Sequence, residues 1–95
     1  MEINRTNINE IILKCGAKPD KDYGQNFLVE PTISSKIVDA LEIKENDNVL
    51  EIGPGLGSLT HFLSLKTNKL TVVDIDRRMC DFVSIIYPNI NLINN

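Results

Sequence analysis

Residues 51–57 of the 95-residue chain read Glu-Ile-Gly-Pro-Gly-Leu-Gly, and this motif is the strongest indication of its fold. It follows a short apolar run at 48–50 and precedes an amphipathic stretch at 58–66, so the order is strand, glycine turn, helix. Glycine takes positive φ without strain and lets the backbone approach a ligand closely. The helix start presents unpaired N–H groups to an electronegative group. The pattern predicts a nucleotide-like cofactor site in an α/β fold.

A second apolar run, residues 70–73, ends at Asp74. In a Rossmann-like unit, an acid about 20 residues beyond the first glycine hydrogen-bonds ribose hydroxyls. Read as G-x-G-x-x-G, however, the turn has Ser58 at the third glycine position. The dinucleotide fingerprint therefore fails at one of its three glycines.

The observed spacing is G-x-G-x-G, with the acid Glu51 two residues before the first glycine. This arrangement resembles the E/D-x-G-x-G-x-G loop of class I methyltransferases, which use S-adenosylmethionine (SAM). The backbone of a tight turn can pair with the amine and carboxylate of SAM, and an acid at the next strand end can orient the ribose. A purely structural interpretation is the alternative, in which the glycines only connect strand to helix.

Upstream, residues 24–28 read Gly-Gln-Asn-Phe-Leu. Together with residues 51–60 and Val-Asp-Ile-Asp at 73–76, this motif resembles the N-terminal part of the rRNA adenine N6,N6-dimethyltransferase family. The resemblance runs from about Lys21 to Asp76. Bacterial members of that family dimethylate adjacent adenines near the 3′ end of small-subunit rRNA. The resemblance therefore implies SAM as cofactor and small-subunit rRNA, in the pre-30S ribosomal subunit, as partner.

The same resemblance implies five cofactor-binding positions: Asn26, Leu28, Gly53, Gly55 and Asp74. Asn26 and the backbone of Leu28 match positions that touch SAM, and Gly53 matches the glycine beside the methionine moiety. Asp74 matches an acid, usually Glu, that binds the ribose. Two alternatives stay open: Asn26 could satisfy its own backbone in a turn, and Asp74 could cap the following helix, although Asp76 is better placed for that cap.

Hydrophobic periodicity predicts a helix after Asn7 that stops near Gly16, and further helices at 31–41, 58–66 and 77–86. Strands are expected at 48–52, 70–74 and 90–93. A βαβαβ unit preceded by two helices is the N-terminal half of a Rossmann-like class I SAM-dependent methyltransferase fold, and its first strand would have an unpaired edge. The second helix is expected to bury four apolar side chains: Ile33, Ile37, Val38 and Leu41.

The family holds its target adenine with an Asn-Leu-Pro-Tyr-like tetrapeptide, and no such sequence occurs in residues 1–95. We therefore assign no catalytic residue and expect that motif beyond residue 95. Residues 1–95 would form the N-terminal part of the SAM-binding domain, without the rest of the catalytic domain and a C-terminal helical domain. The parent protein would be the dimethyltransferase, and this piece would be inactive alone.

Composition narrows the function less than the motifs do. The chain has 13 acidic residues against 10 Lys and Arg, a net charge of −3, so composition gives no support to nucleic-acid binding. Cys15 and Cys80 lack metal-ligand spacing, and we expect reduced thiols in a cytoplasmic protein without a metal site. No signal peptide and no membrane-spanning stretch is evident, so no membrane partner is expected.

Three other functions remain possible from the sequence. A large-subunit rRNA adenine methyltransferase that confers antibiotic resistance shares the N-terminal motifs. A non-catalytic RNA-binding or assembly factor could keep the fold and lose the tetrapeptide. A nicotinamide-dependent dehydrogenase is disfavoured by Ser58 and by the Gly-Gln-Asn-Phe-Leu motif.

Overall fold

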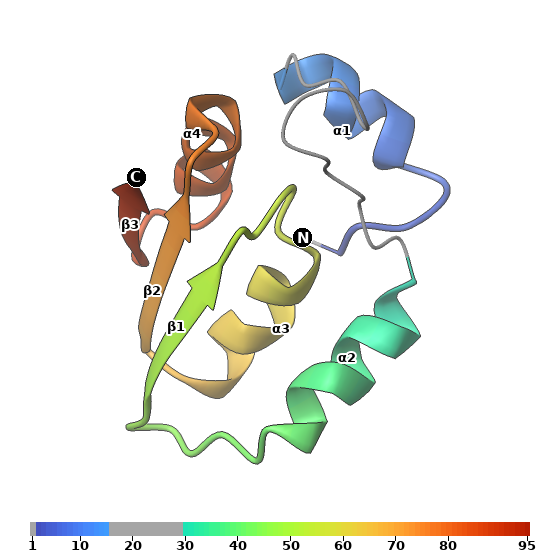
Figure 1. The fold of residues 1–95 in the computed structure, drawn as a ribbon. Coiled ribbons are helices and arrows are strands. Elements are labelled where there is room, and N and C mark those ends of the chain that lie inside the picture. The colour runs from blue at the N-terminus through green and yellow to red at the C-terminus, as the bar shows by residue number, and fades with distance from the viewer. Residues whose placement is uncertain (1, 16–29) are drawn as a thin grey trace.

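The computed structural model describes residues 2–15 and 30–95 of the chain (Figure 1). In order, the elements of this part are α1 (Ile8–Cys15), α2 (Pro31–Ala40), β1 (Asn48–Ile52), α3 (Ser58–Lys66), β2 (Lys69–Asp74), α4 (Arg77–Ile86) and β3 (Asn91–Asn94). The predicted helices and strands are confirmed, with bounds close to those expected. The Gly-Gln-Asn-Phe-Leu motif lies outside the described residues.

The three strands form one parallel sheet in the order β1-β2-β3. Leu50 of β1 lies opposite Thr71 of β2, and Val73 of β2 lies opposite Ile93 of β3. Parallel neighbours need a crossover connection, which α3 supplies between β1 and β2 and α4 supplies between β2 and β3. Within the described part of the chain, β1 is therefore an edge strand, as predicted.

The core lies between the sheet and the helices, in two clusters of buried side chains. Val38 of α2 and Leu63 of α3 pack with Leu70 and Val72 of β2. The second cluster comprises Ile3, Ile11, Leu56 and Met79. Burying each such side chain stabilises the fold by about 1.5–3 kcal/mol. The first cluster thus packs α2 and α3 against β2, and the second packs the glycine turn against α1 and α4.

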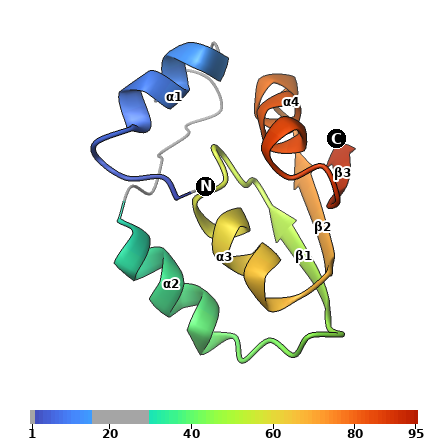
Figure 2. The ribbon, with the colours of Figure 1, turned by 180° about the vertical axis from the view of Figure 1, so that it is seen from behind.

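Helix α2 buries less than its sequence predicts. Val38 is buried as expected, but Ile33, Ile37 and Leu41 are 47%, 43% and 59% exposed. Figures 1 and 2 show the reason, because α2 lies beside α3 and away from the strands. The apolar side chains of α2 span a wider sector of the helix surface than the sector that contacts α3, so some of them stay exposed. The prediction that all four side chains are buried is wrong.

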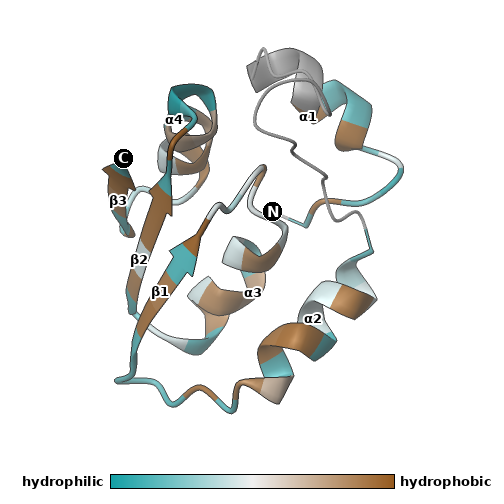
Figure 3. Ribbon diagram, in the orientation of Figure 1, coloured by the Kyte–Doolittle hydropathy of each residue, from teal (hydrophilic) through white to brown (hydrophobic). Residues whose placement is uncertain are grey.

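The two faces of the sheet differ in their cover. Val72 and Leu70 point toward the helices and are buried, whereas Leu50 and Ile52 are 60% and 77% exposed. Figure 3 shows the resulting apolar colour along the strands. Parallel sheets of α/β proteins are normally covered on both faces. The described residues cover one face only, as expected for half of a doubly wound sheet.

Candidate cofactor site

The glycine turn between β1 and α3 has a backbone that few other residues could adopt. Gly53, Gly55 and Gly57 have φ angles of +70°, +59° and +93°, in the left-handed region that disfavours L side chains. The N–H of Gly53 donates to the carbonyl of Val73 at 2.8 Å, so the turn starts as an extension of the sheet. Gly57 is the N-cap of α3.

The two ends of this turn have different surroundings. A Cβ atom added at Gly53 would meet no heavy atom of the described residues within 4 Å. A Cβ atom added at Gly57 would lie 3.6 Å from Thr60 Cβ and 3.6 Å from Tyr87 Cε2. Gly57 is therefore packed into the protein, whereas Gly53 borders open space at the carboxyl edge of the sheet. Open α/β sheets bind their ligands at that edge.

The buried carboxyl of Glu51 lies under the turn. Its Oε1 accepts a hydrogen bond of 2.5 Å from the hydroxyl of Thr60, in the first turn of α3. Both residues are buried, with relative exposures of 8% for Glu51 and 0% for Thr60. This bond joins the residues that flank the turn on its two sides.

Asp74 ends β2 and is also buried. Its Oδ1 accepts a hydrogen bond of 2.9 Å from the N–H of Asp76. The cap of α4 is Asp76, whose side chain accepts from the N–H of Arg78 at 2.9 Å and pairs with the guanidinium of Arg78 at 2.9 Å. The prediction that Asp76 is the better cap is confirmed, and the cap assignment for Asp74 is wrong.

These acids make the carboxyl edge electronegative. Burial raises the pKa of Glu51, the Thr60 hydrogen bond opposes that rise, and the charge of Asp74 adds to it. Burial together with the charge of Glu51 raises the pKa of Tyr87 to about 12. A positively charged ligand group near these carboxyls would relieve the repulsion between them. An amine or a sulfonium has the required charge.

The structure brings together Gly53, Gly55 and Asp74 of the five predicted positions. Asn26 and Leu28 lie outside the described residues, so their roles stay predictions. Sequence reasoning gave no role to Thr60 or Tyr87. The position of Thr60 one helical turn after Gly57 was the available signal, because a hydroxyl there can face back toward the strand end.

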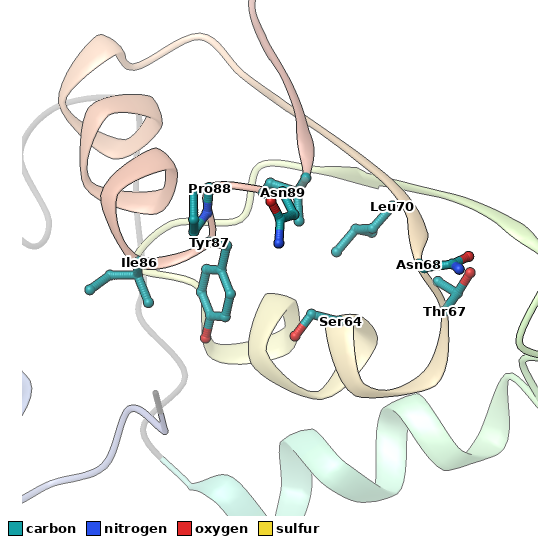
Figure 4. Close-up of a pocket in the computed structure, with 9 residues that line it drawn as sticks. Ser64, Thr67, Asn68, Leu70, Ile86, Tyr87, Pro88 and Asn89 are labelled. Atoms are coloured by element: carbon teal, nitrogen blue, oxygen red, sulfur yellow. The ribbon is translucent and has the colours of Figure 1, made fainter.

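A cavity of about 350 Å³ opens at the opposite edge of the sheet (Figure 4). Its lining comes from the end of α3 and from the segments that precede β2 and β3, and comprises Ser64, Thr67, Asn68, Leu70, Ile86, Tyr87, Pro88, Asn89 and Ile90. This is the amino edge of the strands, where open α/β sheets do not place their ligands. The cavity is therefore not the candidate cofactor site.

Three further findings concern the described residues. They contain no group of three or more His, Cys, Asp and Glu that could hold a metal ion. Their helices are too short or too polar to span a bilayer. Cys80 is a buried thiol without a disulfide, and burial raises its pKa, while the side chain of Cys15 lies outside the described part.

A parallel βαβαβ unit, an acid-flanked glycine turn and an acid at the end of β2 define the class of protein. It is the N-terminal half of the Rossmann-like fold of class I SAM-dependent methyltransferases. The chain belongs to the ribosomal RNA adenine dimethylase family, whose family model matches residues 16–95. The family predicted from the sequence motifs is confirmed.

Similar proteins agree with this membership. Ribosomal RNA small subunit methyltransferase A of Malacoplasma penetrans is 51% identical over 74 residues, which are 78% of this chain and 27% of that protein. A dimethyladenosine transferase from Plasmodium falciparum superposes with a TM-score of 0.65 at 39% identity, over 70% of this chain and 27% of that structure. The 23S rRNA methyltransferase ErmE gives a TM-score of 0.66 at 32% identity, over 73% and 30%. The chain thus spans less than a third of these proteins.

Proposed function

We propose that this chain is the cofactor-binding N-terminal part of a SAM-dependent rRNA adenine N6,N6-dimethyltransferase that acts on small-subunit rRNA. The observation that carries the proposal is the placement of Gly53 and Asp74. An open glycine turn and a buried acid lie on adjacent strand ends at the carboxyl edge of the sheet. Family membership supplies the reaction, and the relative from Malacoplasma penetrans, named as a small-subunit enzyme, supports the substrate.

The residues would hold SAM in distinct ways. The N–H of Gly53 is already bonded to Val73, so Gly53 would contribute space for the methionine moiety rather than a donor. Gly55 belongs to the same turn. Asp74 would accept hydrogen bonds from the ribose hydroxyls, since Asp carboxylates are acceptors with two oxygens. Asn26 and the backbone of Leu28 would complete the site from the preceding motif.

SAM supplies a methyl group activated by its sulfonium, so the protein has to align the adenine N6 with that carbon. The adenine must be presented outside a helical stack. The family's tetrapeptide for that task does not occur in residues 1–95. This chain would therefore bind the cofactor without performing methyl transfer by itself. The rest of the catalytic domain and a C-terminal helical domain would complete the parent protein.

The partner would be small-subunit rRNA in the pre-30S ribosomal subunit, in the cytoplasm. The net charge of −3 makes this chain a poor electrostatic match for RNA. The principal RNA contacts would therefore come from other parts of the parent.

Binding of S-adenosylhomocysteine and methyl transfer test the two halves of this proposal. Titration calorimetry should show that the 95-residue chain binds S-adenosylhomocysteine and does not bind NAD. Incubation with tritiated SAM and undermethylated small ribosomal subunits should leave the rRNA unlabelled. Equal binding of NAD, or no binding of either ligand, would refute the cofactor assignment. Labelled rRNA would refute the proposed inactivity.

A large-subunit rRNA adenine methyltransferase is the second candidate, favoured by the superposition with ErmE. The parent enzyme separates the candidates when both ribosomal subunits are offered with tritiated SAM. Label in the small-subunit rRNA supports the first proposal, and label in 23S rRNA supports the second. A parent that labels neither would support a non-catalytic assembly factor.

A further inference from the structure

A side-chain hydrogen bond joins the residues on either side of the glycine turn. Glu51 precedes the turn at the end of β1, and Thr60 follows it in the first turn of α3. The Thr60 hydroxyl donates to Glu51 Oε1 at 2.5 Å. The bond therefore links β1 to α3, the two elements that the turn connects.

A glycine-rich turn needs such an external constraint. Glycine has the largest backbone freedom of any residue, and this turn uses it at three positions with positive φ. A loop of this kind can change shape unless its ends are held. Thr60 also lies close to the end of the turn, because its Cβ is 3.6 Å from the place that a Cβ on Gly57 would take.

The surroundings of Glu51 make the hydroxyl important. Asp74 approaches from β2 and adds a like charge, and Tyr87, which follows α4, senses the charge of Glu51. A buried carboxyl without a donor is costly, so it would turn or relax toward water. Thr60 supplies a neutral donor from α3 to this carboxyl.

We propose that Thr60 is a positioning residue of the cofactor site. It holds the Glu51 carboxyl and, through it, keeps the 53–57 turn in the shape that receives the cofactor. The inference rests on the proposed function, because it assigns a role within the same site. It does not make Thr60 a ligand: the side chain is fully buried beneath the turn.

Three variants test this role in the 95-residue chain. Thr60→Val keeps the shape and removes the hydroxyl, whereas Thr60→Ser keeps the hydroxyl. Thr71→Val is the matched control, because Thr71 accepts a 3.3 Å bond from Asn91 in the sheet away from the turn. We expect the Kd for S-adenosylhomocysteine to rise about tenfold in Thr60→Val, as for loss of one hydrogen bond to a charged group. It should stay near the original value in the other two variants.

A second measurement needs no ligand. Carboxyl titration of Glu51 by carbon-13 NMR should give a higher pKa in Thr60→Val than in the unaltered chain, because the Thr60 bond lowers it. Thr60→Ser should restore the original value. A general loss of packing would not distinguish the valine from the serine variant in this way.

The outcomes separate the inference from the function on which it rests. If the unaltered chain binds S-adenosylhomocysteine and Thr60→Val binds it equally well, the positioning role is refuted and the function stands. If the unaltered chain binds nothing, the proposed function fails. In that case, an unchanged pKa of Glu51 in Thr60→Val also refutes the proposed positioning of Glu51 by Thr60. A raised pKa of Glu51 in that variant supports it.

Discussion

The two ends of α3 have different surroundings, and the contrast shows how a candidate binding site differs from a cavity. At the start of α3, the glycine turn has positive φ angles and lies above the buried acids Glu51 and Asp74. At its end lies the cavity of about 350 Å³. There the hydroxyl of Thr67 donates to the carbonyl of Asp47 at 2.6 Å, and that of Ser64 donates to the carbonyl of His61 at 2.7 Å.

Two of the hydroxyls that line the cavity, those of Ser64 and Thr67, thus already donate to backbone carbonyls, and no carboxyl lines it. The turn combines a backbone that glycine adopts without strain with buried carboxyls, whose charge costs free energy to bury unless it is paired. Such costs concentrate at functional sites.

Gly57→Val should have the largest effect, on folding. Valine at φ +93° is strained, and its branched side chain would crowd Thr60 and Tyr87. We expect a loss of about 3 kcal/mol in the free energy of unfolding, from backbone strain plus overpacking. Urea denaturation followed by circular dichroism measures it. A loss below about 1 kcal/mol, the level of a mild surface change, would show that Gly57 is not packed as described.

Gly53→Val should separate binding from folding. Its φ of +70° brings strain of about 1–2 kcal/mol, but no described atom meets the new Cβ. The side chain would instead occupy the space assigned to the cofactor. The Kd for S-adenosylhomocysteine should rise at least about thirtyfold, equivalent to about 2 kcal/mol. Unchanged affinity in the folded variant would mean that the cofactor does not lie against Gly53.

Substitutions of Asp74 and Asp76 should likewise separate an effect on binding from an effect on stability. Asp74→Ala should weaken S-adenosylhomocysteine binding about tenfold, as for loss of a hydrogen bond from a charged group. Asp76→Ala should instead cost about 1 kcal/mol of stability, because it removes the cap of α4. Calorimetry and urea denaturation of both variants give the comparison. An exchange of the two effects would contradict the assignment of Asp74 to the ribose.

Glu51→Gln should change how stability depends on pH. Burial raises the pKa of Glu51 in the folded chain, so its favourable contribution is complete below the unfolded value of 4.5 and is lost as pH rises through the folded value. The variant should lack this loss and gain stability relative to the unaltered chain between pH 4.5 and 7. Urea denaturation at both pH values measures the difference. Glu45→Gln, at an exposed site near the other end of α3, is the control.

Ser64→Ala should have the smallest effect. It removes a cavity hydroxyl that donates to the carbonyl of His61, one turn earlier in α3. Affinity for S-adenosylhomocysteine should stay within about twofold, or about 0.4 kcal/mol. A larger change in affinity would indicate that the cofactor binds in the cavity rather than at the turn.

Local signals in the sequence were sufficient for the elements of the fold. Pro31 at a helix start, Asp76 at another and the glycines at 53–57 mark the boundaries that the structure has. The exposed side of α2 could not be predicted in the same way. Periodicity reports which residues of a helix are apolar, and it does not report what covers them, so Ile33 and Ile37 were misassigned.

The candidate site could also be predicted in part, where it depends on local spacing. The spacing of Gly53, Gly55 and Asp74 predicts a cofactor loop, because strand ends of a parallel sheet meet at one edge. The closeness of Tyr87 to Gly57 depends on how segments far apart in the sequence pack together, and no local pattern encodes it. Asn26 and Leu28 remain predictions that rest on the family resemblance.

The central claim is that the cofactor binds at the glycine turn and not in the cavity. A nitrogen-15 NMR titration of the 95-residue chain with S-adenosylhomocysteine tests it most directly. We expect saturable shifts of the backbone amides of Gly53, Gly55 and Asp74, with little change at Asn68 and Asn89. Saturable shifts confined to Asn68, Asn89 and the other cavity residues, or none at the turn, would contradict it.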